Sequence, residues 1–213
     1  MLRIDVAALA AMAAIGAVSV FPTPSPSPSD TPAKSGTVVV QATPVGPDGH
    51  LLPGYRVSRH LSGATCRTRM HHSETGNAYS CHVRYGFDPC WLTAQRSYVV
   101  CLAAPYHRKV TRLRVARFVN KGGLGKPATM PWGLLLSTGA RTTLIPGKFG
   151  TAGGKAIHYS LDSRYKTVLV GPIDKSGPVW RIRKARNNGR FQFKVTGWVN
   201  IKKAWFGAPT RLH

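Results

Sequence analysis

The sequence predicts an all-β fold, a small sandwich or open barrel that carries two disulfides. Three observations support this fold class. The 213 residues include 22 Gly and 16 Pro, which indicates many turns and little helix. Short apolar or alternating segments recur about every ten residues, and no helical periodicity extends beyond about two turns. All four cysteines lie between Thr65 and Leu102, so the rest of the domain can pack around this stretch.

Residues 1–20 are predicted to be a signal peptide or an N-terminal anchor. An apolar run of about 15 residues begins at Val6, which suits a signal peptide and is short for a membrane span. Ala17-Val18-Ser19 has the small residues of a cleavage site. Because Asp5 borders the run and little positive charge precedes it, cleavage and retention both stay open. Either alternative predicts export.

Residues 21–45 are predicted to be a Pro/Ser-rich disordered linker. Residues 21–36 alternate Pro with Ser or Thr, a composition typical of extended polyproline II. At about 3.1 Å per residue, such a spacer would hold an anchored domain about 50 Å from the membrane. A plain disordered leader is the alternative. Residues 46–208 are predicted to form a single all-β domain, although the turn pattern also fits an ordered start at Val38 or Gly54 and two small lobes.

Strand candidates follow one another through this domain, with Gly, Pro, Asn or Asp between them. They are residues 78–83, 98–103, 109–119, 132–137, 156–160, 167–170, 179–184, 190–196 and 199–204. Short strands at regular spacing, separated by turns, are typical of a sandwich or a barrel.

The clearest element is the hairpin at 179–195, which is predicted to turn at Asn188-Gly189. Strict alternation places its apolar residues on one face: Trp180, Ile182, Phe191, Phe193 and Val195. It places the basic and polar residues on the other face: Arg181, Arg183, Arg190, Gln192 and Lys194. Like charges opposite each other on a sheet are destabilising, so this basic face either lies in water or meets an anion.

A second strand repeats the pattern, because Arg112 and Arg114 alternate with Thr111, Leu113 and Val115. A solvated face explains either strand alone, and the two together favour a functional basic surface. The anion-binding candidates are therefore Arg112, Arg114, Arg181, Arg183, Arg190 and Lys194. The aromatic residues of the hairpin alternate away from its charges, so nucleic acid is expected to bind only non-specifically.

The cysteines are predicted to form two disulfides in an exported domain; they are Cys66, Cys81, Cys90 and Cys101. Their spacing contains no Cys-x-x-Cys pair of the kind found in redox and zinc motifs. Sequential pairing would close two short loops between adjacent strands, and nested pairing is the alternative. The nearby histidines are His60, His71, His72 and His82. A Cys/His metal site is disfavoured, because consecutive histidines cannot comfortably ligate one ion, and no metal or cofactor is predicted.

The charge of the chain is strongly positive. It has 30 Lys and Arg against seven Asp and Glu, a formal net charge of +23. Such a chain attracts polyanions, so an anionic cell-wall polymer, an acidic lipid surface or nucleic acid is the partner class. The alternative is a solvated surface that only reflects general Arg usage. The carboxylates of the predicted domain are Asp48, Glu74, Asp88, Asp162 and Asp174.

No enzyme motif is present, and the sequence favours a non-enzymatic protein. Residues 119–127 resemble a phosphate loop, but Pro127 follows Lys126 where Ser or Thr is required, which predicts a plain loop. Asp88 precedes Pro89, where a turn explains it, and Asp162 and Asp174 lie beside turn residues. A secreted hydrolase with an unrecognised site and a ligand-free spacer domain are the alternatives. A deep pocket in which Asp162 or Asp174 approaches a histidine would favour the hydrolase.

Several short motifs occur in a recognisable order: GATC, NAYSC, FDPCW, VVCLAAP, MPWGLLL and PVW, between residues 63 and 180. This order resembles a family of secreted, disulfide-bonded domains from actinobacteria, and Asp88-Pro89-Cys90 is its most specific part. The resemblance implies export and a disulfide-bonded domain, and it implies no activity. Thr142 and Ser160 stand where the family has a later cysteine pair, which implies that a third bridge has been replaced as a pair.

The sequence therefore predicts an exported, cell-envelope-associated cationic binding module. It would contact anionic surface polymers through a basic β-face. Its specific ligand and its oligomeric state are not predicted.

Overall fold

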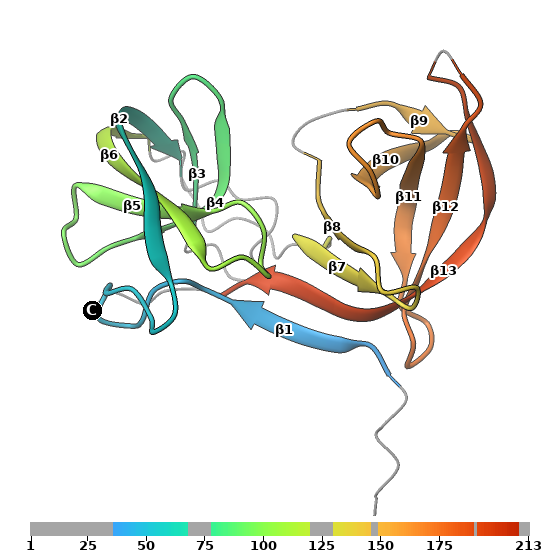
Figure 1. Cartoon of the computed structure of the whole chain (residues 1–213), viewed down its shortest axis with the longest axis horizontal. Coiled ribbons are helices and arrows are strands. Elements are labelled where there is room, and N and C mark those ends of the chain that lie inside the picture. The colour runs from blue at the N-terminus through green and yellow to red at the C-terminus, as the bar shows by residue number, and fades with distance from the viewer. Residues whose placement is uncertain (1–35, 68–77, 120–129, 146–148, 190, 209–213) are drawn as a thin grey trace, which may run out of the picture. The chain divides into compact units, whose positions relative to one another are not determined.

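The computed structural model describes residues 36–67, 78–119, 130–145, 149–189 and 191–208 (Figure 1). All secondary-structure elements in these ranges are β-strands, so the predicted all-β class is confirmed. The strands belong to one compact unit, Lys34–His213. They form two sheets, of which the first is a closed barrel and the second has eight strands.

The closed barrel contains five strands that follow one another along the chain. They are β2 (Arg56–Arg67), β3 (Tyr79–His82), β4 (Gly86–Leu92), β5 (Tyr98–Leu102) and β6 (Lys109–Val119). Neighbouring strands are antiparallel, and parallel pairing of β2 with β6 closes the barrel (Figure 1). The β2–β6 pairing shifts register three times, and such bulges bend a strand around a small barrel. The closure leaves no free edge in this sheet.

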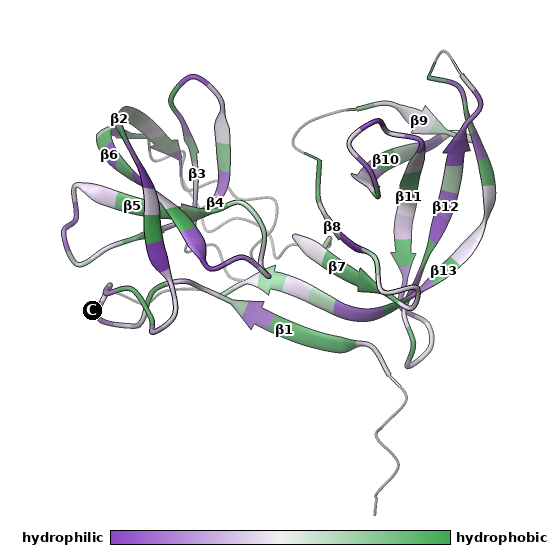
Figure 2. Cartoon of the chain, in the orientation of Figure 1, coloured by the Kyte–Doolittle hydropathy of each residue, from purple (hydrophilic) through white to green (hydrophobic). Residues whose placement is uncertain are grey.

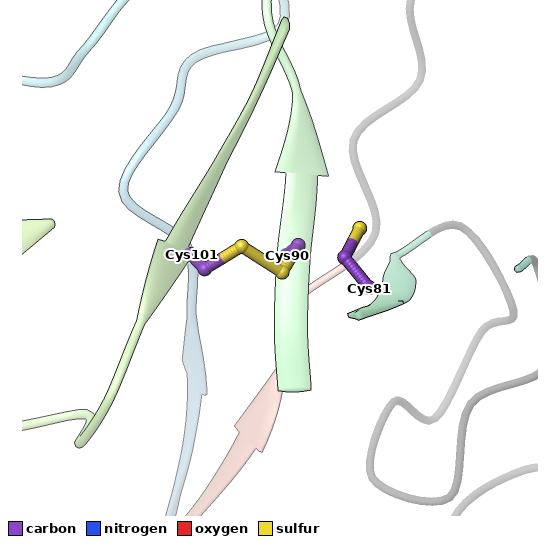
Figure 3. Close-up of side chains that lie close together, drawn as sticks. All are labelled: Cys81, Cys90 and Cys101. Carbon is purple, nitrogen blue, oxygen red and sulfur yellow. A yellow bond between two sulfur atoms is a disulfide. The ribbon is translucent and has the colours of Figure 1, made fainter. Parts of the chain in front are cut away.

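The two disulfides lie in the interior of the barrel. Cys66 is bonded to Cys81 and Cys90 to Cys101, which is the sequential pairing favoured by the sequence. Each bond joins residues directly opposite each other on adjacent strands. Figure 3 shows the Cys90–Cys101 bond with the Cys81 sulfur beside it. All four side chains are buried and pack with Ala64, Val99 and Leu113.

Asp88 lies within β4, although a turn was predicted at this position. The Asp88-Pro89 peptide bond is cis, and both residues belong to the strand that carries Cys90 and Trp91. Burial raises the pKa of the Asp88 carboxyl from 3.8 to about 7. The barrel therefore contains a carboxyl group that titrates near neutral pH.

The second sheet has a continuous path of seven strands. They are β8 (Arg141–Thr143), β7 (Gly133–Leu136), β13 (Phe193–Gly207), β12 (Arg181–Asn187), β11 (Thr167–Asp174), β10 (Lys155–Ser160) and β9 (Thr151–Ala152). The eighth strand, β1 (Val38–Ala42), pairs in parallel with β13. Part of the stretch 21–45 is thus ordered sheet. β13 is one long strand where two were predicted.

Both faces of this sheet are apolar in its middle strands. In β11, Leu169 packs in a cluster with Tyr159 and Ile182, whereas Val168 and Val170 point to the opposite face. Hydrophilic and hydrophobic residues alternate along β12 (Figure 2). A short antiparallel bridge, Leu144 with Tyr159, links the chain after β8 to β10. A backbone hydrogen bond from the Ile145 N–H to the His158 carbonyl, at 2.8 Å, supports the same contact.

Thr142 of β8 and Ser160 of β10 lie together beside this bridge. Thr142 is 2% exposed, and its Oγ1 donates a hydrogen bond of 2.6 Å to the Ser160 carbonyl oxygen. We expect the double variant Thr142→Cys/Ser160→Cys to form a third disulfide. The two positions are 18 residues apart, and a loop of this size contributes about 3 kcal/mol to the free energy of unfolding, less any strain. Thiol titration and thermal unfolding with and without reductant measure both effects.

The control is Thr142→Ala/Ser160→Ala, which loses the hydrogen bond and cannot form the bond between sulfurs. Two free thiols in the folded cysteine variant would show that the backbone does not bring these positions within bonding distance.

Candidate functional site

The hairpin between β12 and β13 turns over three residues and not at Asn188-Gly189 alone. The Asn188 N–H donates to the Gln192 carbonyl, and the Gln192 N–H donates to the Gly189 carbonyl, both at 2.9 Å. Phe191 has a φ of 58°, in the left-handed region. Asn187 consequently pairs with Phe193. Because side chains alternate with a period of two, this register moves the residues of β13 to the opposite face from the predicted one.

A bulge shifts the register a second time. β12 advances one residue from Lys184 to Ala185 while β13 passes from Gly197 to Val195, so Thr196 is the extra residue. The Thr196 hydroxyl donates to the Lys184 carbonyl oxygen at 3.2 Å. Beyond the bulge, Arg183 pairs with Trp198. With the predicted turn at Asn188-Gly189, Lys194 would have paired with Arg183. A tryptophan takes the place of that lysine.

The predicted faces of this hairpin are therefore wrong in part. Arg181 and Arg183 do share a face, but Lys194 pairs with Arg186 on the opposite face. Ile182 packs in the cluster around Leu169, whereas Phe193 and Val195 pack against the cluster on the other side of the sheet. Arg190 lies outside the described residues. The like-charge pair expected across from Arg183 is replaced by a cation and an aromatic ring.

Trp198 is the centre of a group of side chains called the Trp198 cluster below. Its members are Lys155, Asp174, Arg181, Arg183 and Trp198. The indole of Trp198 is 44% exposed. The guanidinium carbons of Arg181 and Arg183 lie 4.9 and 4.8 Å from its ring centroid. Each cation–π contact contributes about 0.5–1 kcal/mol at an exposed site, so the ring holds two guanidinium groups close together.

Asp174 orients the first of these arginines. The Arg181 Nε donates to Asp174 Oδ2 at 2.8 Å. The other carboxylate oxygen accepts hydrogen bonds from the Ser176 hydroxyl at 2.7 Å and from the Ser176 backbone N–H at 3.0 Å. The Ser176 hydrogen bonds and the Arg181 guanidinium lower the pKa of Asp174 from 3.8 to about 2. Asp174 is therefore ionised at neutral pH and fixes Arg181 beside the ring.

A cavity of about 230 Å³ lies next to the indole. It is lined by Lys155, Val170, Pro172, Ile173, Asp174, Arg183 and Trp198. Lys155 reaches it by crossing β11 at Gly171, whose φ is 74°. A Cβ on Gly171 would lie 2.9 Å from the Lys155 Cδ, so glycine makes room for the lysine stem. Among the described residues, no carboxylate forms an ion pair with Lys155 or Arg183.

Arg112 and Arg114 lie on β6 of the barrel and so belong to a different sheet from Arg181 and Arg183. The Arg112 guanidinium carbon is 4.1 Å from the Tyr98 ring centroid, and Nη2 donates to the Gln95 side chain. Arg114 is exposed and pairs with Tyr98 in the β5–β6 ladder. The six predicted candidates therefore do not share one sheet, and their role in anion binding stays a prediction.

The histidines and cysteines considered for a metal site are only partly described. His60 on β2 and His82 on β3 are exposed, and His71 and His72 lie outside the described residues. The sulfur atoms of Cys81, Cys90 and Cys101 lie within 4.8 Å of one another (Figure 3). Each of them is already bonded to another sulfur, so they offer no thiolate to an ion. The loop with Lys121 and Lys126 also lies outside the described residues.

Asp162 has a structural role in a turn. Its carboxylate accepts backbone hydrogen bonds from Arg164, Lys166 and Thr167 at 2.9–3.0 Å. These bonds, led by that from Lys166, lower the pKa of Asp162. Neither Asp162 nor Asp174 contacts a histidine in the described part of the chain, which is the arrangement that would have favoured a hydrolase.

Sequence reasoning missed two members of the cluster, Trp198 and Lys155. Trp198 falls between the two strands predicted at 190–196 and 199–204, so no pairing partner was assigned to it. A continuous strand through Gly197 would have placed it on the basic hairpin. Lys155 reaches the cluster only through the bulge at Gly171, and no local pattern signals that contact.

In comparisons with known proteins, no family model, curated protein or solved structure matches the chain. A search of the described residues for a helix with the length and hydropathy of a membrane span finds none.

Proposed function

We propose that this protein is an exported, cell-envelope-associated binding module that contacts an anionic surface polymer through the Trp198 cluster. The observation that carries the proposal is the exposed Trp198 ring with Arg181 and Arg183 beside it and Lys155 across the adjacent cavity. Two arginines lie against the ring, and Lys155 and Asp174 line the cavity beside it. An acidic polysaccharide or polyol phosphate chain offers the matching chemistry.

The contacts divide into two kinds. The flat face of an indole packs against the apolar face of a sugar or the carbon chain of a polyol, which removes apolar area from water. The guanidinium groups donate charge-assisted hydrogen bonds to phosphate or carboxylate oxygens. Because the ring and Asp174 hold both arginines in place, little side-chain entropy is lost when an anion binds. An acidic lipid surface could use the same cations but would not require the cavity.

The carboxylates of the domain support this proposal, because several have local roles. Asp48 pairs with His50 at 3.2 Å, Asp162 accepts backbone hydrogen bonds, and Asp174 orients Arg181. Burial favours the protonated form of Asp88. The 30 Lys and Arg therefore have few free carboxylates to offset them, and polyanions are attracted over long range at low salt.

Export is supported by the two disulfides, which persist in oxidising compartments. The apolar run within residues 1–20 fits a signal peptide or an anchor. In an envelope the module would encounter anionic wall polymers, and contact with nucleic acid would be non-specific.

The proposal is tested by co-sedimentation of the full chain with a purified poly(glycerol phosphate) wall polymer. We expect the variant Arg181→Gln/Arg183→Gln to bind about a hundredfold or more weakly, because it loses two charge-assisted contacts of about 1.5–3 kcal/mol each. The matched control is Arg96→Gln/Arg164→Gln, which removes two exposed arginines outside the cluster. We expect the control to change affinity by about twofold or less. Equal losses in both variants would show that binding is diffuse and would overturn the proposal.

A further inference from the structure

A second cavity, of about 280 Å³, lies on the barrel. It is lined by Gly49, His50, Leu51, Val57, Thr93, Ala94, Gln95, Val100 and Arg112. None of these residues belongs to the Trp198 cluster. Its size is near the lower end of the range for small-molecule pockets, which limits it to a small ligand. This cavity is called the Arg112 pocket.

The walls of the Arg112 pocket are built from two turns that hydrogen-bond to each other. The Ala94 N–H donates to the Gly49 carbonyl at 3.0 Å. Gly49 has a φ of 78°, and a Cβ there would lie 2.3 Å from the Ala94 nitrogen. The Thr93 hydroxyl donates to the carbonyl oxygens of Gln95 and Tyr98 at 2.9 and 3.1 Å. The wall is thus formed by close-packed backbone, and a ligand would not have to order it.

The floor of the pocket is apolar, since Leu51, Val57, Ala94 and Val100 contribute to its lining. Val100 is 1% exposed and pairs with Arg112 across the β5–β6 ladder, so both side chains lie on the same side of the sheet. An apolar surface therefore adjoins one guanidinium group. This combination suits a ligand with a hydrocarbon body and an anionic end.

Two uncharged side chains hold Arg112 in one orientation. Its guanidinium stacks on Tyr98, 4.1 Å from the ring centroid, and Nη2 donates to the Gln95 side chain. Its Nε is buried and finds no hydrogen-bond partner in the described part of the chain. Among the described residues, no carboxylate forms an ion pair with Arg112. An uncompensated, partly desolvated cation favours an anion at its remaining donors.

We propose that the Arg112 pocket binds a small amphiphilic carboxylate, with the carboxylate on Arg112 and the hydrocarbon body on Leu51, Val57 and Ala94. This site is independent of polymer binding at the Trp198 cluster. The carboxylate oxygens accept hydrogen bonds from the planar guanidinium, a geometry that a lysine could not reproduce. The apolar body displaces water from the partly exposed side chains of Leu51 and Val57.

The test uses the full ¹⁵N-labelled chain titrated with hexanoate, hexan-1-ol or hexylammonium. We expect hexanoate to bind with a dissociation constant on the order of 1 mM and to shift the backbone amide resonances of Gly49, Ala94 and Val100. The neutral alcohol should bind about tenfold more weakly, and the ammonium ion still more weakly, because neither compensates Arg112. Shifts of the same size with all three probes, or shifts confined to other residues, would overturn the proposal.

Arg114 supplies the matched control, because it lies two positions further along the same strand, is exposed and does not line the pocket. Arg112→Gln should weaken hexanoate binding about tenfold and leave hexan-1-ol binding within about twofold. Arg114→Gln should leave both within about twofold. Equal losses in the two variants would show that general positive charge attracts the carboxylate. If Arg112→Gln does not fold, the preference of the unmodified chain for hexanoate over hexan-1-ol still decides the question.

Discussion

The double variant Cys90→Ala/Cys101→Ala is expected to lower the free energy of unfolding by about 3–5 kcal/mol. The bond closes a loop with a sequence separation of 11, and loops of this size contribute about 3 kcal/mol in the chain-entropy model. The two side chains are 0% and 3% exposed, so their removal also leaves a cavity in the barrel core. For a domain of this size, the loss corresponds to a fall in melting temperature of roughly 10 °C. Thermal unfolding followed by circular dichroism measures it.

The comparison variant is Cys66→Ala/Cys81→Ala, which opens the other loop, with a sequence separation of 15. Its loss should be similar or slightly larger, because loop entropy rises slowly with length. Reduction of the unmodified protein should lower the melting temperature at least as far as either variant. A melting temperature within about 2 °C of the unmodified protein would show that the barrel does not depend on these bonds.

The free energy of unfolding is expected to fall as the pH rises from about 4 to about 7, because of Asp88. Burial raises the pKa of this carboxyl from 3.8 to about 7 in the folded protein. Between these values the folded state keeps a proton that the unfolded chain has released, so each rise in pH favours unfolding. The effect is absent below the unfolded pKa and complete above the folded one. At 1.4 kcal/mol per pKa unit it reaches at most about 4 kcal/mol.

Asp88→Asn isolates this group from the other titrating side chains, because an amide stays neutral throughout. We expect the variant to match the unmodified protein near pH 4 and to be the more stable of the two at pH 8. Asp48→Asn is the control, since Asp48 is exposed and a backbone hydrogen bond from His50 lowers its pKa. For that control, the free energy of unfolding should depend on pH with the same slope as in the unmodified protein. Parallel stability curves for Asp88→Asn and the unmodified protein would contradict a raised pKa at Asp88. Urea unfolding at several pH values provides the curves.

Local patterns in the sequence predicted several of the strands and favoured the observed disulfide pairing. β6 was predicted with its observed bounds, Lys109–Val119. Loop length favoured the observed cysteine pairing over the nested one, since short loops join adjacent antiparallel strands. β4 was missed because Gly86 and the Asp88-Pro89 pair are typical of turns, yet the barrel accommodates all three in a strand.

The make-up of the candidate site depends on the register between β12 and β13, which local patterns did not reveal. Phe191 adopts a conformation that favours glycine, so the hairpin loop is longer than Asn188-Gly189 predicts. Thr196 adds a bulge that no single-strand pattern indicates. These two changes place Trp198 opposite Arg183 and move Lys194 to the other face. Parallel pairing of β2 with β6 could likewise not be predicted from local patterns, since it joins segments far apart in the chain.

Tryptophan indole resonances test polymer binding at the Trp198 cluster most directly. The full ¹⁵N-labelled chain is titrated with poly(glycerol phosphate), and the five indole N–H signals are followed. Trp198 is 44% exposed, whereas Trp91 and Trp132 are buried at 0% and 2%. The account predicts a saturable shift of the Trp198 indole signal and unchanged signals from Trp91 and Trp132. A Trp198 signal that stays in place while the polymer binds would contradict it.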